Sequence, residues 1–205
     1  MGLENSNSAQ FLSIGNGKII RRVAAPTATS KERTAKNGKL VHEESYDKIT
    51  GTITGIVVRV HDEYGKFWTI TLDDGADQYK LDFKYSSGYA SAFLKTLPNV
   101  DLSQPVTLIP KMTIEGEKKK TSLFINQHGQ ALKWYFTKDH RHDLPEMQQV
   151  KVKGQLQWDD TDMMEYLENM VKTEILPKLT KAVVAAPVVA GHEDEAIEPD
   201  SEMPF

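Results

Sequence analysis

The run ITGTITGIVVRVH, from Ile49 to His61, decides how this chain folds. It is rich in β-branched residues, which fit the pleated surface of a strand. Gly51 and Gly55 stand inside it, and glycine within a strand is typical of a bulge or a sharp bend. The run therefore predicts one long, bent strand, and the segments on either side can be arranged around it.

Two shorter segments with alternating polar and apolar residues follow this strand. Residues 67–72 place Trp68 and two aliphatic side chains on one face, and residues 79–85 place Phe83 on a face with two other apolar residues. Successive side chains of a strand point to opposite faces, so these apolar faces predict a core that includes Trp68 and Phe83. Turn residues separate the segments, and we expect a three-stranded antiparallel meander.

A helix and further strands come after the meander. Ser86 or Ser87 can cap a helix that ends near Leu97, because Pro98 follows. Strands are expected over residues 105–114 and 121–126, with a loop over 115–120 and β character over 131–137. The order of three strands, a helix and two strands or more matches the five-stranded, partly open Greek-key barrel of the OB-fold, so the expected fold class is mainly β.

The flanking segments have patterns of their own. Gly15-Asn16-Gly17 predicts the tight turn of a hairpin. Residues 149–158 are expected to form a closing strand, and residues 160–176 an amphipathic helix that Pro177 ends. The expected divisions are an N-terminal hairpin and flexible basic arm over 1–38, an OB-fold domain over 39–158, an amphipathic helix over 159–181, and a linker with a disordered acidic tail over 182–205.

The charge of the chain is distributed unevenly. Residues 1–158 carry 22 basic and 17 acidic side chains, whereas residues 159–205 carry 3 and 12. A mildly basic body with an acidic end indicates an anionic partner for the body and a different role for the end. Cysteine is absent from the 205 residues, which excludes a disulfide framework and a thiol nucleophile. The longest apolar run, residues 182–190, is too short to span a bilayer, so we expect a cytoplasmic protein without a membrane partner.

A groove for single-stranded DNA needs cations that follow the phosphates and aromatic faces on which bases stack. Side chains of both kinds point away from the predicted core, and Arg59 does so if a bulge at Gly55 shifts the alternation of its strand. Lys118, Lys119 and Lys120 are expected on the loop between the fourth and fifth strands, which is a binding loop of the fold. The expected DNA-binding residues are Arg59, Tyr64, Phe67, Lys80, Lys84, Lys111, Lys118, Lys119, Lys120, Phe124, Lys133 and Tyr135.

The last residues form the most specific motif of the sequence. Residues 193–205 hold six acidic side chains and no basic one, and they finish in Met203-Pro204-Phe205. Such a segment does not fold by itself. Its apolar end offers a partner an aromatic anchor and a carboxylate suited to a basic pocket.

This motif resembles the tail of the bacterial and phage single-stranded DNA-binding proteins, in which an OB-fold body is followed by a linker and an acidic peptide ending in an apolar residue, Pro and Phe. In that family the tail recruits replication, recombination and repair proteins, and the resemblance implies this role for Asp200, Met203, Pro204 and Phe205. The N-terminal hairpin, the helix over 160–176 and the short linker suit a phage-type member. The resemblance implies a protein that coats and protects single-stranded DNA. If a phage encodes it, the protein acts in the host cytoplasm. The sequence leaves the oligomeric state open, and among homo-oligomers a dimer is favoured.

Two alternatives remain beside this interpretation. One is an OB-fold adaptor that binds RNA or protein and has a regulatory tail. The other is a small nuclease whose carboxylate ligands include Asp73, Asp74 and Asp77. The glycine patterns of nucleotide-binding loops are absent, and so is a nucleophile elbow. His140 and His142 lack a third ligand at a recognisable spacing. The sequence therefore predicts a protein that is not an enzyme and needs neither cofactor nor metal.

Overall fold

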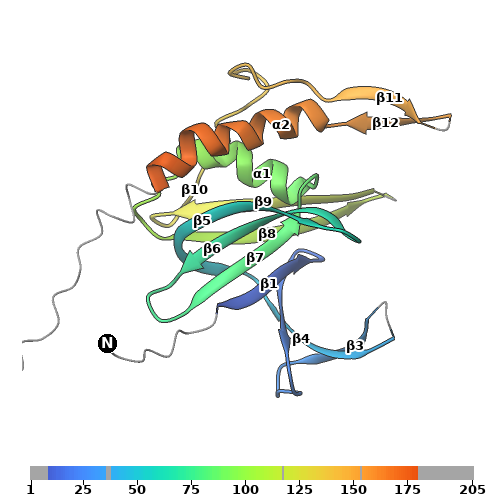
Figure 1. Cartoon of the computed structure of the whole chain (residues 1–205), viewed down its shortest axis with the longest axis vertical. Helices are drawn as coiled ribbons and strands as arrows, with labels where there is room; N and C mark the ends of the chain where they lie inside the picture. The colour runs from blue at the N-terminus through green and yellow to red at the C-terminus, as the bar shows by residue number, and fades with distance from the viewer. Residues whose placement is uncertain (1–8, 36–37, 117, 153, 180–205) are drawn as a thin grey trace, which may run out of the picture.

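The long strand expected from Ile49 to His61 is present with those bounds, as β5, in the computed structural model of the chain. The structure describes residues 9–35, 38–116, 118–152 and 154–179. Within these residues ten strands form one mixed sheet, in the order β10-β9-β8-β5-β6-β7-β1-β2-β4-β3 (Figure 1). The other strands of this sheet are β1 (Gln10–Gly15), β2 (Lys18–Val23), β3 (Lys31–Thr34), β4 (Leu40–Tyr46), β6 (Gly65–Asp73), β7 (Gln78–Lys84), β8 (Val106–Glu115), β9 (Lys118–Gln127) and β10 (Gln130–Ala131).

β5 pairs with two different strands along its length. Its first residues, Ile49–Gly51, pair with β8, and from Thr52 onward it pairs with β6. The pairing register shifts between Ile53 and Gly55, which confirms the predicted bulge. A bulge inserts an extra residue and changes which side chains face inward beyond it. Arg59 consequently lies on the outward side of the sheet.

The sheet does not close into a barrel. β5, β6 and β7 form the expected meander, and β8 pairs with β9 on the other side of β5. The remaining edge of β7 is occupied by β1, which runs parallel to it from the pair Gln10 and Tyr79 to the pair Ser13 and Asp82. The expected N-terminal hairpin of β1 and β2 is confirmed. Because this hairpin takes the edge of β7, that edge is not available for pairing with β9.

Two helices cover the inner face of the sheet, and α1 lies between the sheet and α2 (Figure 1). α1 (Gly88–Thr96) begins after Ser87, whose hydroxyl accepts the N–H of Ala90 as predicted, and the 3-10 turn η1 (Leu97–Asn99) follows it. α2 is Thr161–Met170, and a π-helical turn, η2 (Val171–Ile175), follows it. The helix then continues to residue 179. The buried side chains confirm that Trp68 and Phe83 lie in the core and that the C-terminal helix is amphipathic; they include Trp68, Ile70, Leu72, Leu81, Phe83, Phe93, Met164, Leu167, Val171 and Ile175.

The prediction that Pro177 ends the C-terminal helix is wrong, because helical structure continues to residue 179. A proline lacks an N–H, and its ring clashes with the carbonyl four residues earlier in a regular α-helix. In η2 the N–H of Leu176 donates to the carbonyl of Val171, five residues earlier. This wider turn changes the spacing of the local carbonyls and accommodates the proline.

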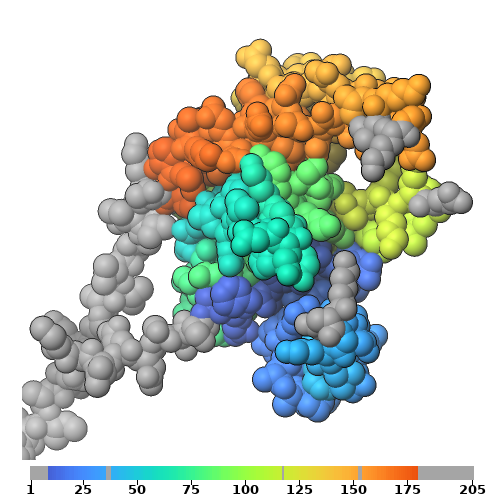
Figure 2. Space-filling model, turned by 45° about the vertical axis from the view of Figure 1, so that its right-hand side comes forward, coloured from blue at the N-terminus to red at the C-terminus, as the bar shows by residue number. Residues whose placement is uncertain are grey.

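The predicted flexible arm contains a strand that its composition does not reveal. Residues 31–34 form β3, which pairs with β4. The pairing brings Arg33 within 2.6 Å of Glu43, which also binds Arg22. These ion pairs link three strands, so charged residues that favoured a solvated arm instead hold a sheet edge together. Figure 2 shows β3 and β4 as a lobe beside the body.

Two strand predictions near the C-terminal side are also wrong. The β character expected over 131–137 is limited to β10, which ends at Ala131. The closing strand expected over 149–158 is a separate hairpin of β11 (Gln148–Val152) and β12 (Gln155–Asp159). Gly154 turns this hairpin with a φ of 86°, a conformation that glycine adopts without strain. None of the described helices is long and apolar enough to cross a membrane.

Candidate nucleic-acid interface

The outward side of β5, β6 and β7 carries an aromatic ring between two cations. Phe67 on β6 stands opposite Arg59 on β5 and opposite Lys84 on β7. Directly paired residues of neighbouring strands have side chains on the same face, about 5 Å apart at Cβ. The three side chains therefore form one row across the sheet, which we call the first row.

A second row lies further along the same strands. Thr71 on β6 is paired with Lys80 on β7, and Lys80 is paired with Phe11 on β1. The Lys80 ammonium lies 5.5 Å from the centre of the Phe11 ring, within the range of a cation–π contact. Phe11 is 59% exposed. We call the two rows and the residues between them the outer face.

One acidic side chain lies between the two rows. The Thr69 hydroxyl donates to Asp82 at 2.6 Å, and a terminal guanidinium nitrogen of Arg59 lies 3.8 Å from the same carboxylate. This contact orients Arg59 across the sheet. The outer face then has three cations, Arg59, Lys80 and Lys84, against one acid, so its net charge is positive.

Tyr64 extends the outer face at the tip of the β5–β6 hairpin. Its ring centre lies 4.7 Å from that of His61, which is on the outward side of β5 in the alternation set by Arg59. The hydrogen bond between the Tyr64 hydroxyl and Glu63 raises the pKa of the tyrosine. Tyr64 is exposed, and its ring is open to a stacking partner.

The lysines expected on a loop lie on a strand instead. Lys118, Lys119 and Lys120 are the first residues of β9 and pair with Glu115, Ile114 and Thr113 of β8. The turn is short and includes Gly116 at a φ of 60°, so these residues are used in strand pairing. By alternation Lys118 and Lys120 share the outward side of the hairpin with Lys111 and Phe124, and Lys119 is on the other side. The Lys120 ammonium forms an ion pair with the Glu115 carboxylate at 2.5 Å.

Lys133 and Tyr135 are separated from the other candidates. The backbone N–H of Tyr135 donates to the carbonyl of Lys95 on α1 at 2.7 Å, and the tyrosine ring stacks on His142 at 4.3 Å. The carbonyl of Lys133 accepts a hydrogen bond from Asn99 at 3.0 Å. Both residues thus lie beside the C-terminal end of α1, which is on the inner side of the sheet.

Phe11 is an aromatic residue of the outer face that the sequence analysis does not include among the DNA-binding residues. Phe11 precedes the buried Leu12 in β1, and the alternation of a strand therefore predicts that the Phe11 side chain is exposed. The position of Phe11 beside Lys80 is not predictable from the sequence, because β1 and β7 are about 70 residues apart and pair in parallel.

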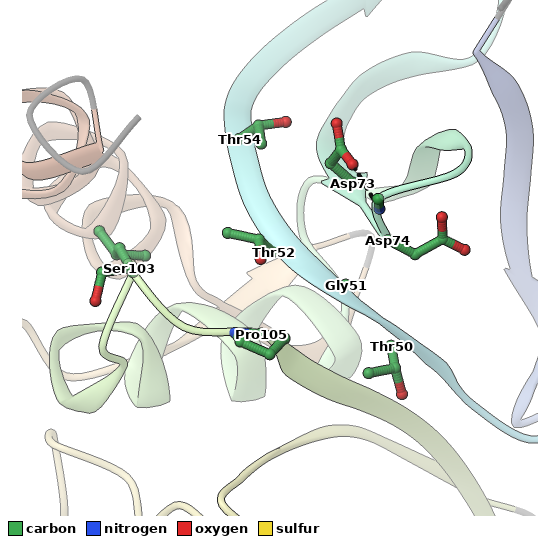
Figure 3. A pocket seen from close by; sticks show the side chains of 10 residues that line it. Thr50, Gly51, Thr52, Thr54, Asp73, Asp74, Ser103 and Pro105 are labelled. Atoms are coloured by element: carbon green, nitrogen blue, oxygen red, sulfur yellow. Dashed lines mark hydrogen bonds between the residues drawn. The ribbon is translucent and has the colours of Figure 1, made fainter. Parts of the chain in front are cut away.

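The carboxylates of the nuclease alternative are used within a turn. Asp73 accepts the N–H of Gly75 at 2.8 Å, and Asp74 accepts the N–H groups of Ala76 and Asp77. The backbone hydrogen bond from Asp77 is the main cause that lowers the pKa of Asp74. Asp73 and Asp74 line a pocket of about 470 Å³ together with Thr50, Thr52, Thr54 and Ser103 (Figure 3). Among the described residues, no group of three or more His, Asp or Glu side chains is placed to hold a metal ion.

The residues expected to bind partner proteins, Asp200, Met203, Pro204 and Phe205, lie outside the described part of the chain. No family model, no curated protein and no solved structure matches the chain.

Proposed function

We propose that this chain is a single-stranded DNA-binding protein without catalytic activity and that β5–β9 with α1 are an OB-fold whose sheet is left open. The first row carries the proposal: a half-buried ring, Phe67, lies between two exposed cations, Arg59 and Lys84, on the outer face of the sheet. A base stacked on the Phe67 ring would have a cation on each side. The sugar-phosphate backbone of the DNA could then run past either cation. Such a surface recognises the π-face that every base has, and it is sequence-tolerant.

The strand order supports the fold part of the proposal. The series β7-β6-β5-β8-β9, with α1 between β7 and β8 in the chain, has the order of an OB-fold from its third strand to its fifth. Ligands of that fold bind on the face of the second and third strands and at the loops between strands one and two and between strands four and five. In this chain those elements are β6, β7, the tip with Tyr64 and the β8–β9 hairpin.

The acidic segment supports the wider role. By its resemblance to the tails of single-stranded DNA-binding proteins, we propose that residues 193–205 recruit replication, recombination or repair proteins while the body coats and protects the DNA. Its six acids would be repelled by the DNA phosphates, which leaves the segment available to a protein partner.

The test is a titration of full-length protein with three labelled ligands of equal length: oligo-dT, oligo-U and a DNA duplex, each at low and at high salt, read by fluorescence anisotropy. We expect oligo-dT to bind at least about tenfold more tightly than the duplex, and we expect its affinity to fall as salt rises, since bound cations release counterions from phosphate. Equal affinity for oligo-dT and the duplex would refute the proposal. Tighter binding of oligo-U than of oligo-dT would favour the RNA adaptor.

A further inference from the structure

A second surface of the molecule combines exposed tryptophans with cations. It is a groove of about 350 Å³ between the last turn of α1, the segment over 134–147, and the junction of β12 with α2. Its floor is apolar and buried, and its rim is apolar and exposed. The floor residues are Phe136, Leu144 and Met163, and the rim residues are Trp134, Met147 and Trp158. We call this surface the tryptophan groove.

The tryptophan groove is separate from the outer face. It is lined by Lys95 of α1 and Met163 of α2, and these helices lie on the inner side of the sheet (Figure 1). The rim tryptophans are 47% and 64% exposed. Large aromatic side chains grouped at an exposed concave surface are typical of a docking site, because their contact area is large and their conformational freedom is small.

The groove has more positive than negative charge. Lys95, Lys138 and Arg141 line it together with one acid, Glu146, which forms an ion pair with Arg141. Lys95 has no ion pair within the described residues; its ammonium instead lies 5.7 Å from the centre of the Trp134 ring. Burial, with a contribution from Arg141, lowers the pKa of Lys95. A carboxylate near this ammonium would oppose that shift, because a nearby opposite charge favours the charged form of the lysine.

The ligand that fits these features is an acidic peptide with a large apolar side chain, and the chain contains one. Residues 193–205 have six acids, no base, and an apolar end at Met203 and Phe205. We propose that the tryptophan groove binds residues 193–205 of the same chain, with the apolar residues against the tryptophans and the acids facing Lys95 and Lys138. This inference does not depend on the proposed function.

The connection is long enough for this contact. α2 begins beside the groove and its helical continuation ends at residue 179, a length of roughly 27 Å at 1.5 Å per residue. The 13 residues from 180 to 192 can span up to about 43 Å when extended. Tethering a segment in this way gives an effective concentration in the millimolar range, so even a weak contact would be occupied.

The absence of cysteine from the sequence permits a direct proximity test in the full-length chain. The groove variant combines Met147→Cys with Met203→Cys. Its matched control, the sheet variant, combines Ser13→Cys, which is exposed on the outer side of β1, with the same Met203→Cys. Both are treated at low concentration with a short bismaleimide, and the cross-link is located by peptide mass mapping after circular dichroism has confirmed an unchanged fold.

We expect the cross-link within one chain to form at least tenfold faster in the groove variant than in the sheet variant. Adding Lys95→Ala and Lys138→Ala to the groove variant should slow the reaction severalfold. Equal rates, or faster reaction in the sheet variant, would overturn the proposal. Cross-links found only between two chains would overturn it as well, because the occupant would then be the segment of a second copy.

Tryptophan quenching gives an independent measurement without cysteines. Trp68 is buried, whereas Trp134 and Trp158 form the rim of the groove. If Phe205 covers this rim, Phe205→Ala in the full-length chain should raise the accessibility of the tryptophans to acrylamide by about twofold or more. Unchanged quenching would count against the groove as the docking site.

Discussion

The two sides of β7 are built from neighbouring residues with opposite environments. Leu81 and Phe83 point inward and are buried against the helices, whereas Lys80 and Lys84 point outward. β6 shows the same division, with Trp68 inward and Phe67 outward. A strand alternates its side chains with a period of two, so stability and binding can be assigned to adjacent residues that hardly influence each other. Variants at adjacent positions are therefore the sharpest way to test the division.

The largest effect is expected from an inward residue. Leu81→Ala removes a fully buried side chain, and a substitution of this kind lowers the free energy of unfolding by about 2–5 kcal/mol. Lys80→Ala, the adjacent outward change, should lower it by less than about 0.5 kcal/mol. Urea unfolding followed by circular dichroism measures both. If the two variants lost similar stability, the division between the faces of β7 would be wrong.

The second effect concerns the stacking ring of the first row. Phe67→Ala should weaken binding of oligo-dT by about 1–3 kcal/mol, the contribution of one stacked base, or about 5- to 150-fold in affinity. Tyr135→Ala is the matched aromatic control, because Tyr135 stacks on His142 away from the outer face. Anisotropy titrations compare the two with wild type. A larger loss from Tyr135→Ala would move the binding surface to the helix side.

A smaller effect is expected from the outward cations. Replacing Lys80 and Lys84 together by Ala should reduce the slope of log affinity against log salt by about 1.4, since each phosphate contact to a single strand contributes about 0.7. The control pair is Lys31→Ala with Lys178→Ala, two exposed lysines outside the outer face. Titrations over a series of salt concentrations give the slopes. An unchanged slope in the first double variant would show that these lysines do not contact phosphate.

The smallest effect concerns acid conditions and the lobe of β2–β4. Hydrogen bonds from Tyr46, from Thr27 and from Arg21 lower the pKa of Glu44 from 4.5 to about 2. Because the folded pKa lies below the unfolded one, the stabilisation by this carboxylate is present above about pH 4.5 and is lost as the pH falls toward about 2. The protection of the β2 and β4 amides against hydrogen exchange, taken relative to the intrinsic rate at each pH, should fall over this interval while that of β6 does not.

Glu44→Gln tests the assignment of this pH dependence. In this variant the protection of the same amides should be lower already near neutral pH and should fall less between about pH 4.5 and 2. Glu32→Gln, at an exposed carboxylate of β3, should behave like wild type. A wild-type pH profile in Glu44→Gln would assign the acid sensitivity to another group.

Much of the meander could be predicted from the sequence because its signals are local. The alternation over residues 67–72 and 79–85 placed Trp68 and Phe83 in the core, and Gly55 indicated the bulge that turns Arg59 outward. The helix N-cap at Ser87 could be predicted for the same reason. Each of these features depends on residues within a few positions of one another.

The features that the sequence did not reveal depend on distant partners or on geometry that composition hides. The parallel pairing of β1 with β7 joins segments about 70 residues apart, so the neighbours Phe11 and Lys80 were not predicted together. Lys118–Lys120 have the composition of a loop, yet pairing with β8 makes them a strand. Pro177 indicates a helix end, and only the π-helical turn before it explains why the helix continues.

The position of β1 on the edge of β7 has a consequence for how the chain acquires its structure. β1 leaves the ribosome well before its partner strand, which is synthesised roughly 70 residues later, and closing so long a loop is slow compared with forming a local hairpin. The meander can therefore form before β1 docks. Until then the edge of β7 presents unpaired backbone groups, which other chains can join. Docking of β1 then covers this edge, so we expect the risk of aggregation to be greatest in the interval between folding of the meander and docking of β1.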